Sequence, residues 1–198
     1  MVRFMSKILE KDQAINQKAI NAIRSLIECI GDDPGRSELK KSPYKILEVL
    51  QSYFAGYAVN SDEILAETIE EVEGYDDIIM LKDINFTSYC EHHFLPFSGK
   101  CHIGYIPNKK IAGIGKFVEV LEAFAGRLQI QERLTVLIAE AIYKNLQPKG
   151  VGVVIEAKHN CLSFKHQSCN NAVMRTGKML GAFHEDYNIR NEFLSALK

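Results

Sequence analysis

The sequence has no apolar run that approaches the roughly 18–20 residues needed by a membrane-spanning helix. Its first twelve residues, MVRFMSKILEKD, also lack the long apolar core of a secretion signal. Neither sign of charge dominates, because 24 Lys and Arg residues stand against 25 Asp and Glu residues, a formal net charge of -1. We therefore expect a cytoplasmic protein that has neither a membrane nor a nucleic acid as its partner.

The chain also lacks the dense, even set of cysteines that typifies a small secreted disulfide protein. Its five cysteines are widely spaced, so we expect free thiols that serve burial, metal binding or catalysis. There is no internal repeat and no linker rich in Pro, Ser or Gly. What is present is an ordinary globular composition, with 46% hydrophobic and 25% charged residues in a chain of 198.

Helical periodicity marks the first third of the sequence. Apolar residues recur at three- and four-residue steps over 14–30, and Gly31 is placed to end that helix. The segment 31–37, GDDPGRS, is typical of a loop, and Ser42-Pro43 is typical of a second helix start. An acidic stretch over 62–77 fits a solvated linker or helix. We therefore predict an N-terminal helical segment at residues 1–75.

The composition changes after this segment, and residues 76–198 are predicted to form a second domain. Residues rich in Ile, Phe, Tyr and Val predict strands, and segments with one apolar face predict helices. The predicted strands are 78–86, 99–106, 151–157 and an extended region over 168–179; the predicted helices are 116–125, 130–146 and 188–197. The order β-β-α-α-β-β with antiparallel pairing predicts an α+β domain.

The sharpest candidate for chemistry is the tetrapeptide Cys90-Glu91-His92-His93. Cys90 and His93 are three residues apart, so one tight or helical turn puts both side chains on the same side. A thiolate and an imidazole in that arrangement suit zinc.

A third ligand is predicted in the distant tripeptide His159-Asn160-Cys161. Residues two apart on a strand share a face, so we expect His159 and Cys161 to point together. Three protein ligands with water in the fourth position would make a catalytic zinc site, with His92 and His159 as candidate proton-transfer groups. Taken singly, each of these residues also fits a structural role, because cysteine is among the most often buried residues.

Four stretches, in order along the chain, resemble the motifs of the GTP cyclohydrolase I family. They are CEHHFLPFSG at 90–99, HIGYIP at 102–107, QIQERLT at 129–135 and HNC at 159–161. The resemblance runs from about Ile20 to Leu197. It implies a tunnelling fold, in which the sheets of several subunits join in a ring and two rings stack into a homodecamer with active sites at subunit interfaces. It also implies that residues 76–198 form the catalytic domain, which would convert GTP and water into 7,8-dihydroneopterin triphosphate and formate.

The resemblance assigns roles to individual residues. Cys90, His93 and Cys161 match the ligands of a Zn²⁺ cofactor. His159 matches the principal proton-transfer histidine, and His92 matches a second one near the ribose.

The resemblance also marks residues that would bind the substrate. Glu132 matches the carboxylate that accepts hydrogen bonds from guanine N–H groups, and Gln131 has a weaker claim to contact the base. Lys116 matches a lysine of the triphosphate clamp. Lys165 and His166 stand where the family usually has Arg-Gly, and we expect both to contact substrate.

The triphosphate clamp departs from the family pattern. Gly115 stands at a position where the family has Ser, and Glu119 at one where it has Arg. Arg-to-Lys changes keep charge but lose bidentate phosphate recognition, and a carboxylate repels phosphate. Three hypotheses remain open: a GTP cyclohydrolase I with an altered clamp, a paralogue that hydrolyses C8 of a guanine-type purine with fewer phosphates, and a non-catalytic purine- or pterin-binding ring protein.

Overall fold

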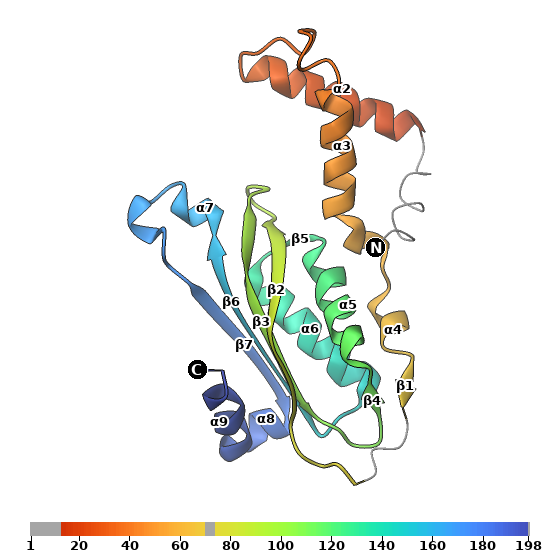
Figure 1. Ribbon diagram of the computed structural model, residues 1–198, viewed down its shortest axis with the longest axis vertical. Coiled ribbons are helices and arrows are strands. Elements are labelled where there is room, and N and C mark those ends of the chain that lie inside the picture. The colour runs from red at the N-terminus through yellow and green to blue at the C-terminus, as the bar shows by residue number, and fades with distance from the viewer. Residues whose placement is uncertain (1–12, 70–73, 198) are drawn as a thin grey trace. The chain divides into compact units, whose positions relative to one another are not determined.

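The computed structural model of the chain describes residues 13–69 and 74–197 (Figure 1). The chain divides into two compact units, residues 1–58 and 59–198. The peptide MVRFMSKILEKD, on which the expectation about secretion rests, lies outside the described residues. Across those described residues, every helix is too short or too polar to traverse a lipid bilayer.

The first unit contains the helices α2 (Gln13–Cys29) and α3 (Ser42–Tyr53) and the short 3₁₀ helix η1 (Ala55–Ala58). Both predicted helices are confirmed. Ile20 and Ile27, on one face of α2, are buried, whereas Leu26 stays 61% exposed. Gly31 adopts a φ of +94°, the left-handed conformation that ends a helix with little cost for glycine.

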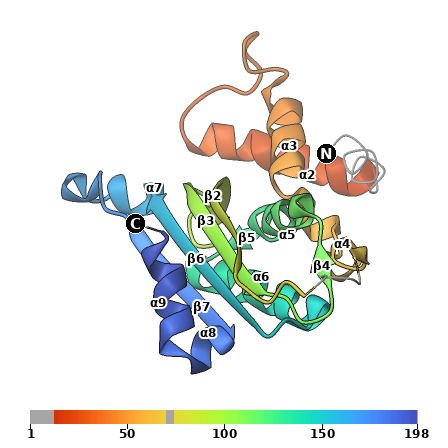
Figure 2. The same cartoon turned by 60° about the horizontal axis from the view of Figure 1, so that its bottom comes forward.

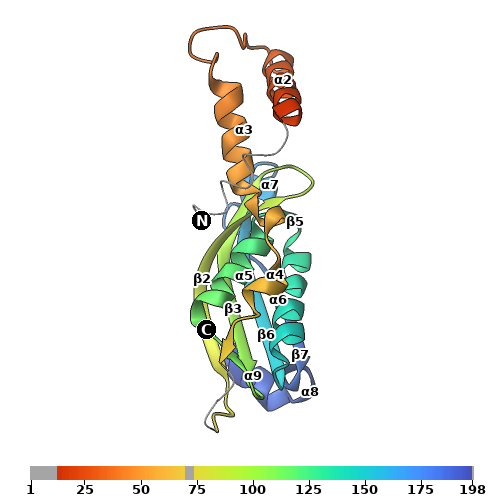
Figure 3. The same ribbon diagram turned by 90° about the vertical axis from the view of Figure 1, so that its right-hand side faces the viewer.

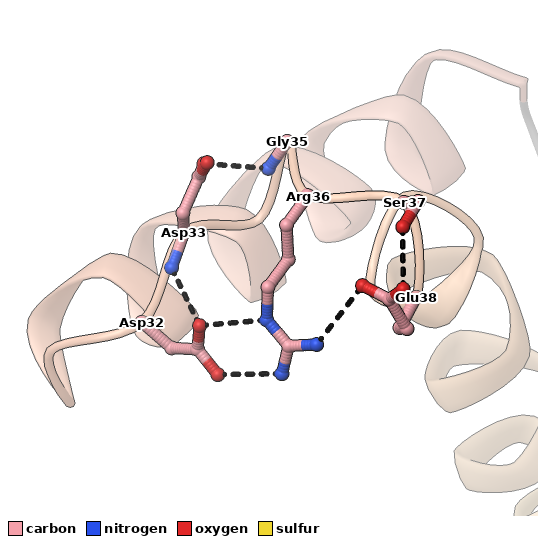
Figure 4. Close-up of polar contacts among 6 residues, drawn as sticks. All are labelled: Asp32, Asp33, Gly35, Arg36, Ser37 and Glu38. Atoms are coloured by element: carbon pink, nitrogen blue, oxygen red, sulfur yellow. Dashed lines mark hydrogen bonds and ion pairs between the residues drawn. The ribbon is translucent and has the colours of Figure 1, made fainter.

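Ion pairs organise the loop between these two helices (Figure 4). The guanidinium of Arg36 donates two hydrogen bonds to Asp32, at 2.8 and 2.9 Å, and contacts Glu38 at 3.4 Å. This pairing lowers the pKa of Asp32 to about 2. The carboxylate of Asp33 accepts the backbone N–H of Gly35 and closes the next turn.

The second unit is built on a five-stranded sheet with the strand order β5-β2-β3-β6-β7 (Figure 1). The four long strands pair antiparallel, and β5 pairs parallel to the end of β2. The strands are β2 (Ile79–Cys90), β3 (Pro96–Ile106), β5 (Leu128–Gln129), β6 (Gly150–His159) and β7 (Met174–Gly181). Two long helices, α5 (Ile114–Ala125) and α6 (Gln131–Leu146), lie between β3 and β6 in sequence, which confirms the predicted order.

The two faces of this sheet carry different helices (Figures 2 and 3). On β6, Val151, Val153 and Ile155 belong to the large core cluster shared with α5 and α6. Val154 faces the other way, into a smaller cluster with Phe183 and Phe193 of the C-terminal helices α8 (Ala182–Glu185) and α9 (Tyr187–Ser195). Because alternate strand residues point to opposite faces, the sheet is covered on both sides around Val154, whereas Asn85 of β2 and Lys100 of β3 are exposed.

Several boundaries differ from those predicted. The strand predicted at 78–86 continues to Cys90, and its partner begins at Pro96 instead of Gly99, because the two pair along their whole length. The extended region predicted at 168–179 begins with the 3₁₀ helix η2 (Gln167–Cys169), and strand β7 starts only at Met174. The short helices α4 (Ser61–Ile64), α7 (Asn160–Ser163) and α8, and the two-residue strands β1 (Thr68–Ile69) and β4 (Ile111–Ala112), were not expected.

The division between the two units falls at 58/59, whereas the sequence placed it at 75/76. Ile64 and Leu65 explain the difference, because both are buried in the core of the second unit. Asp62 adds an ion pair at 2.7 Å to Lys144 of α6. Strand β1 pairs with β4 of the same unit.

Candidate metal centre and active site

A closed turn joins β2 to β3 and shapes the Cys90 motif. The backbone N–H groups of His93 and Phe94 both donate to the carbonyl of Cys90, and the N–H of Cys90 donates to Leu95. Phe94 adopts a φ of +56°, which reverses the chain. The turn brings the side chains of Cys90 and His93 to the same side, as their spacing predicted.

Cys161 joins this pair from a segment distant in sequence. The ligand atoms of Cys90, His93 and Cys161 all lie within 4.8 Å of one another. Nδ1 of His93 is 3.7 Å from Sγ of Cys90. A tetrahedral zinc ion with ordinary bond lengths would hold a sulfur and a nitrogen roughly 3.5 Å apart, so this donor set fits zinc in both chemistry and spacing.

The backbone conformation that positions Cys161 differs from the prediction. His159 is the last residue of β6, and Cys161 lies in the helical turn α7, so the argument that both share a strand face was wrong. The backbone leaves the strand conformation after His159 and enters a helical turn at Asn160. Burial and the neighbouring Cys90 raise the pKa of the Cys161 thiol. A divalent cation bound to Cys161 would oppose this effect and favour the thiolate.

His159 is held by two contacts next to this group. Its Nε2 lies 2.7 Å from Oε1 of Gln131, and its ring stacks on Phe97 with a centroid distance of 4.7 Å and an interplanar angle of 2°. Burial lowers the pKa of His159, and the nearby charge of Glu132 partly opposes this effect. Its imidazole is thus neutral at neutral pH and able to accept a proton.

His92 is exposed, in contrast to His159. Its Nδ1 lies 3.8 Å from Sγ of Cys90, and its Nε2 lies 3.9 Å from Glu91. Glu91 in turn accepts two hydrogen bonds from Arg133 of α6, at 2.5 and 3.1 Å, and this pairing lowers the pKa of Glu91. The ion pair joins the turn after Cys90 to the start of α6.

The two candidate base-binding residues occupy the first turn of α6 and differ in exposure. Glu132 is exposed, so its carboxylate is accessible to a ligand. Gln131 is only 1% exposed, and its carboxamide is occupied by β6, β7 and His159. The side chain of Gln131 therefore supports other protein groups in the structure.

Lys165 and His166 follow α7. Nζ of Lys165 lies 3.0 Å from Nε2 of His93, so this lysine is beside the candidate metal group. His166 is exposed, and its backbone N–H donates to Leu162. The structure thus places the Lys165 side chain at the site.

Lys116 lies elsewhere in the unit. It is near the start of α5, beside β4, whereas β5 follows the other end of that helix and pairs with Cys90 (Figure 1). The distance along the axis from Lys116 to the helix end is roughly 14 Å at 1.5 Å per residue. Its ammonium pairs with Glu67 at 3.1 Å and with Glu119 at 3.7 Å. One copy of the chain therefore does not bring Lys116 to the metal group.

Two supporting features were not found from the sequence. Phe97 stacks on His159 because the two residues are direct partners in the β3–β6 register, a relation that the motif FLPFSG does not reveal. The Glu91–Arg133 pair joins two motifs that were each identified separately. Strand register could have suggested the first pair, since residues opposite each other on antiparallel strands interact.

Two thiols, an imidazole and a half-buried second histidine at one end of a sheet define a candidate metalloenzyme site. The profile of the family described as GTP cyclohydrolase I matches residues 19–198. The chain belongs to the GTP cyclohydrolase I family, as its motifs predicted. The antiparallel sheet with α5 and α6 on one face is accordingly the α+β tunnelling fold that the resemblance implies.

Individual relatives resemble this chain over most of its length. The chain is 38% identical to "GTP cyclohydrolase 1" of Pelagibacter ubique, over 96% of this chain and 94% of that protein. It is 44% identical to the protein of the same name from Rickettsia bellii, over 90% and 93% of the two chains. Among solved structures, archaeosine synthase QueF-Like in the apo form aligns with 53% of this chain and 94% of its own, with a TM-score of 0.45 and 19% identity.

Proposed function

We propose that this chain catalyses the GTP cyclohydrolase I reaction, in which GTP and water give 7,8-dihydroneopterin triphosphate and formate. The observation that carries the proposal is the convergence of Cys90, His93 and Cys161, with His159 two residues before Cys161 in the sequence. It is supported by relatives named GTP cyclohydrolase 1 at 38–44% identity. All the residues proposed for the site lie in the second unit, in keeping with a catalytic domain in the C-terminal part of the chain.

Cys90, His93 and Cys161 would hold the metal, and zinc is the ion that best suits two thiolates and one imidazole. Bound zinc supplies Lewis acidity that makes water a nucleophile near neutral pH. Nζ of Lys165, 3.0 Å from Nε2 of His93, adds positive charge at the same place. We infer that Lys165 contributes to binding the anionic substrate there.

The histidines would carry the protons of the reaction. Opening the imidazole ring of guanine, releasing C8 as formate and closing the pterin ring each require proton transfer to or from nitrogen and oxygen atoms of the substrate. His159, neutral and held by two contacts, is suited to accept and return a proton. His92 is exposed next to Cys90 and is the second candidate.

Glu132 would recognise the guanine base. An ionised carboxylate offers only acceptors, which matches the N–H groups on one edge of guanine. Glu132 is exposed in the first turn of α6, one residue from Gln131. His166 remains a candidate contact, because it is exposed and adjacent to Lys165.

The position of Lys116 supports self-association. Lys116 lies far from the metal group of its own chain, so a triphosphate would reach both only if Lys116 comes from another copy. Within the part of the chain that the structure describes, no strand pairs with the outer edge of β7, which leaves an edge able to extend the sheet. We propose the homodecamer that the resemblance implies, and light scattering should give a mass of ten times the 22.4 kDa chain.

One substrate series tests the activity. The zinc-loaded protein is incubated with GTP, GDP, GMP and guanosine, and formate and pterin fluorescence are measured. We expect turnover of GTP to exceed that of the other three by at least about tenfold, because the clamp recognises phosphate charge. Equal or faster turnover of a less phosphorylated substrate would favour the paralogue, and no product from any of them would favour a non-catalytic binding protein.

A further inference from the structure

The carboxamide of Gln131 occupies a buried position between two strands and His159. Its Nε2 lies 3.0 Å from the carbonyl oxygen of Ile155 and 3.0 Å from that of Met174. It also lies 3.1 Å from the hydroxyl of Thr176. The side chain is only 1% exposed, so these contacts replace water.

These partners fix which way the carboxamide points. Backbone carbonyls can only accept hydrogen bonds, so the group that faces Ile155 and Met174 must be the NH₂ of Gln131. Turning the amide over would place its oxygen against two carbonyl oxygens and leave buried groups without donors, which is costly. The amide oxygen therefore faces Nε2 of His159, at 2.7 Å.

The direction of this hydrogen bond determines where His159 carries its proton. An amide oxygen cannot donate, so Nε2 of His159 must carry a hydrogen and donate it to Gln131. A neutral imidazole has one N–H, and Nδ1 is then the unprotonated nitrogen. No hydrogen bond from another described residue to Nδ1 is found, so this nitrogen remains available to a ligand.

Phe97 fixes the plane of the same ring. The two rings are parallel to within 2° and their centroids are 4.7 Å apart. Phe97 is 1% exposed and lies directly opposite His159 in the β3–β6 register, so it cannot move without disturbing the core. Gln131 and Phe97 together fix the orientation of the imidazole.

We propose that Gln131 is a positioning residue that holds His159 as the Nε2–H tautomer, which makes Nδ1 the atom that exchanges a proton with the substrate. The catalytic consequence rests on the role of His159 in the proposed function. The tautomer follows from the hydrogen-bond geometry alone. Gln131 thus acts on the reaction through His159 and does not contact guanine through its side chain.

The test compares two buried glutamines changed in the same way. Gln131→Met keeps length and volume but cannot accept the proton of His159. Gln129→Met is the matched control, because Gln129 is 2% exposed, donates to Phe124 and does not contact His159. We expect kcat for GTP to fall about 100-fold in Gln131→Met, the lower end of what one general acid–base contributes. We expect KM to change less than about threefold, and Gln129→Met to stay within about threefold of the unaltered protein in both constants.

A second measurement reads the tautomer without relying on activity. Solid-state ¹⁵N NMR of the zinc-loaded protein labelled at histidine, assigned by subtraction of the His159→Asn spectrum, reports which nitrogen of His159 bears the hydrogen. We expect Nε2–H in the unaltered protein and in Gln129→Met, and a mixture of tautomers in Gln131→Met. Nδ1–H in the unaltered protein would overturn the proposal, and so would equal kcat in the two glutamine variants. If the unaltered protein has the Nε2–H tautomer but does not convert GTP, the positioning contact stands and the proposed function fails.

Discussion

The sequence motifs assign the candidate metal ligands and Lys116 to one active site. The structure supports these two parts in different ways. The candidate metal ligands come together within a single chain, where their three donor atoms lie within 4.8 Å of one another near the ends of β2 and β6. Lys116 lies near the start of α5 and faces two carboxylates of its own chain, Glu67 and Glu119. Backbone hydrogen bonds and packing support the candidate metal ligands, whereas Lys116 and its two carboxylates lie at the surface.

This difference indicates which part of the proposed active site a single chain supplies. The turn after Cys90 and the buried contacts of His159 hold their side chains before any ligand arrives, so little is lost in organising them. Exposed ion pairs are weak and are screened by salt, so the contacts of Lys116 can be exchanged for a phosphate. One chain therefore brings the candidate metal ligands together, whereas the surroundings of Lys116 depend on the local balance of charge.

The largest effect is expected from the metal side of this comparison. Cys161→Ala removes one of three proposed ligands, and we expect bound zinc to fall from about one per chain to below about 0.2, with GTP turnover reduced by at least about 1,000-fold. Elemental analysis and the formate assay measure the two effects. Cys169→Ala is the matched control, because Cys169 is outside the group and should leave both values unchanged. Full zinc content in Cys161→Ala would show that the ligand assignment is wrong.

A smaller effect is expected from the Lys116 side. Glu119→Gln removes one of the two carboxylates that face Lys116, and we expect KM for GTP to fall about two- to fivefold at low salt with kcat unchanged. The effect should vanish near 0.5 M salt, because screening weakens interactions between exposed charges. Glu122→Gln, on the same helix and also exposed, is the control. Equal KM values for Glu119→Gln and Glu122→Gln would argue against a role of Lys116 in phosphate binding.

The smallest effect is expected in the first unit, which contains none of the proposed site residues. Asp32→Asn removes the charge that pairs with Arg36, and we expect the thermal midpoint at pH 7 to fall by no more than about 2 °C, because exposed ion pairs contribute little. The folded-state pKa of Asp32 is lowered from 3.8 to about 2, so its contribution is present above pH 3.8 and is lost as the pH falls through 2. As the pH falls from 3.8 to about 2, the difference in thermal midpoint between Asp32→Asn and the unaltered protein should therefore narrow. Asp33→Asn, which keeps an oxygen to accept from Gly35, should match the unaltered protein throughout.

Local patterns in the sequence predicted much of the fold. Apolar periodicity located α2, α3, α5 and α6 to within two residues at most ends, because one buried face leaves a clear signal. The spacing of Cys90 and His93 predicted their proximity, because a turn constrains residues three apart. Strand ends were less predictable, since pairing with a partner strand extends a strand beyond its apolar residues.

Features that depend on distant parts of the chain were not predictable in this way. The place where β6 gives way to a helical turn before Cys161 carries no local signal. The carboxamide of Gln131 looked like a ligand contact, because its strand partners Ile155 and Met174 are remote in sequence. The two carboxylates beside Lys116 include Glu67, which only the tertiary fold brings there.

The glycines beneath the C-terminal aromatic rings bear on the position of His159. Gly104 and Gly152 are partners in the β3–β6 ladder, and a Cβ on Gly104 would lie 2.8 Å from the ring of Phe193, while one on Gly152 would lie 2.7 Å from Phe183. A slip of the ladder by a single residue would put a side chain under those rings and lift the last helices from the sheet. The same ladder, seven residues further along, sets Phe97 against His159. The packing of the C-terminal helices thus helps to fix the register that places His159 against Phe97 at the opposite end of the strands.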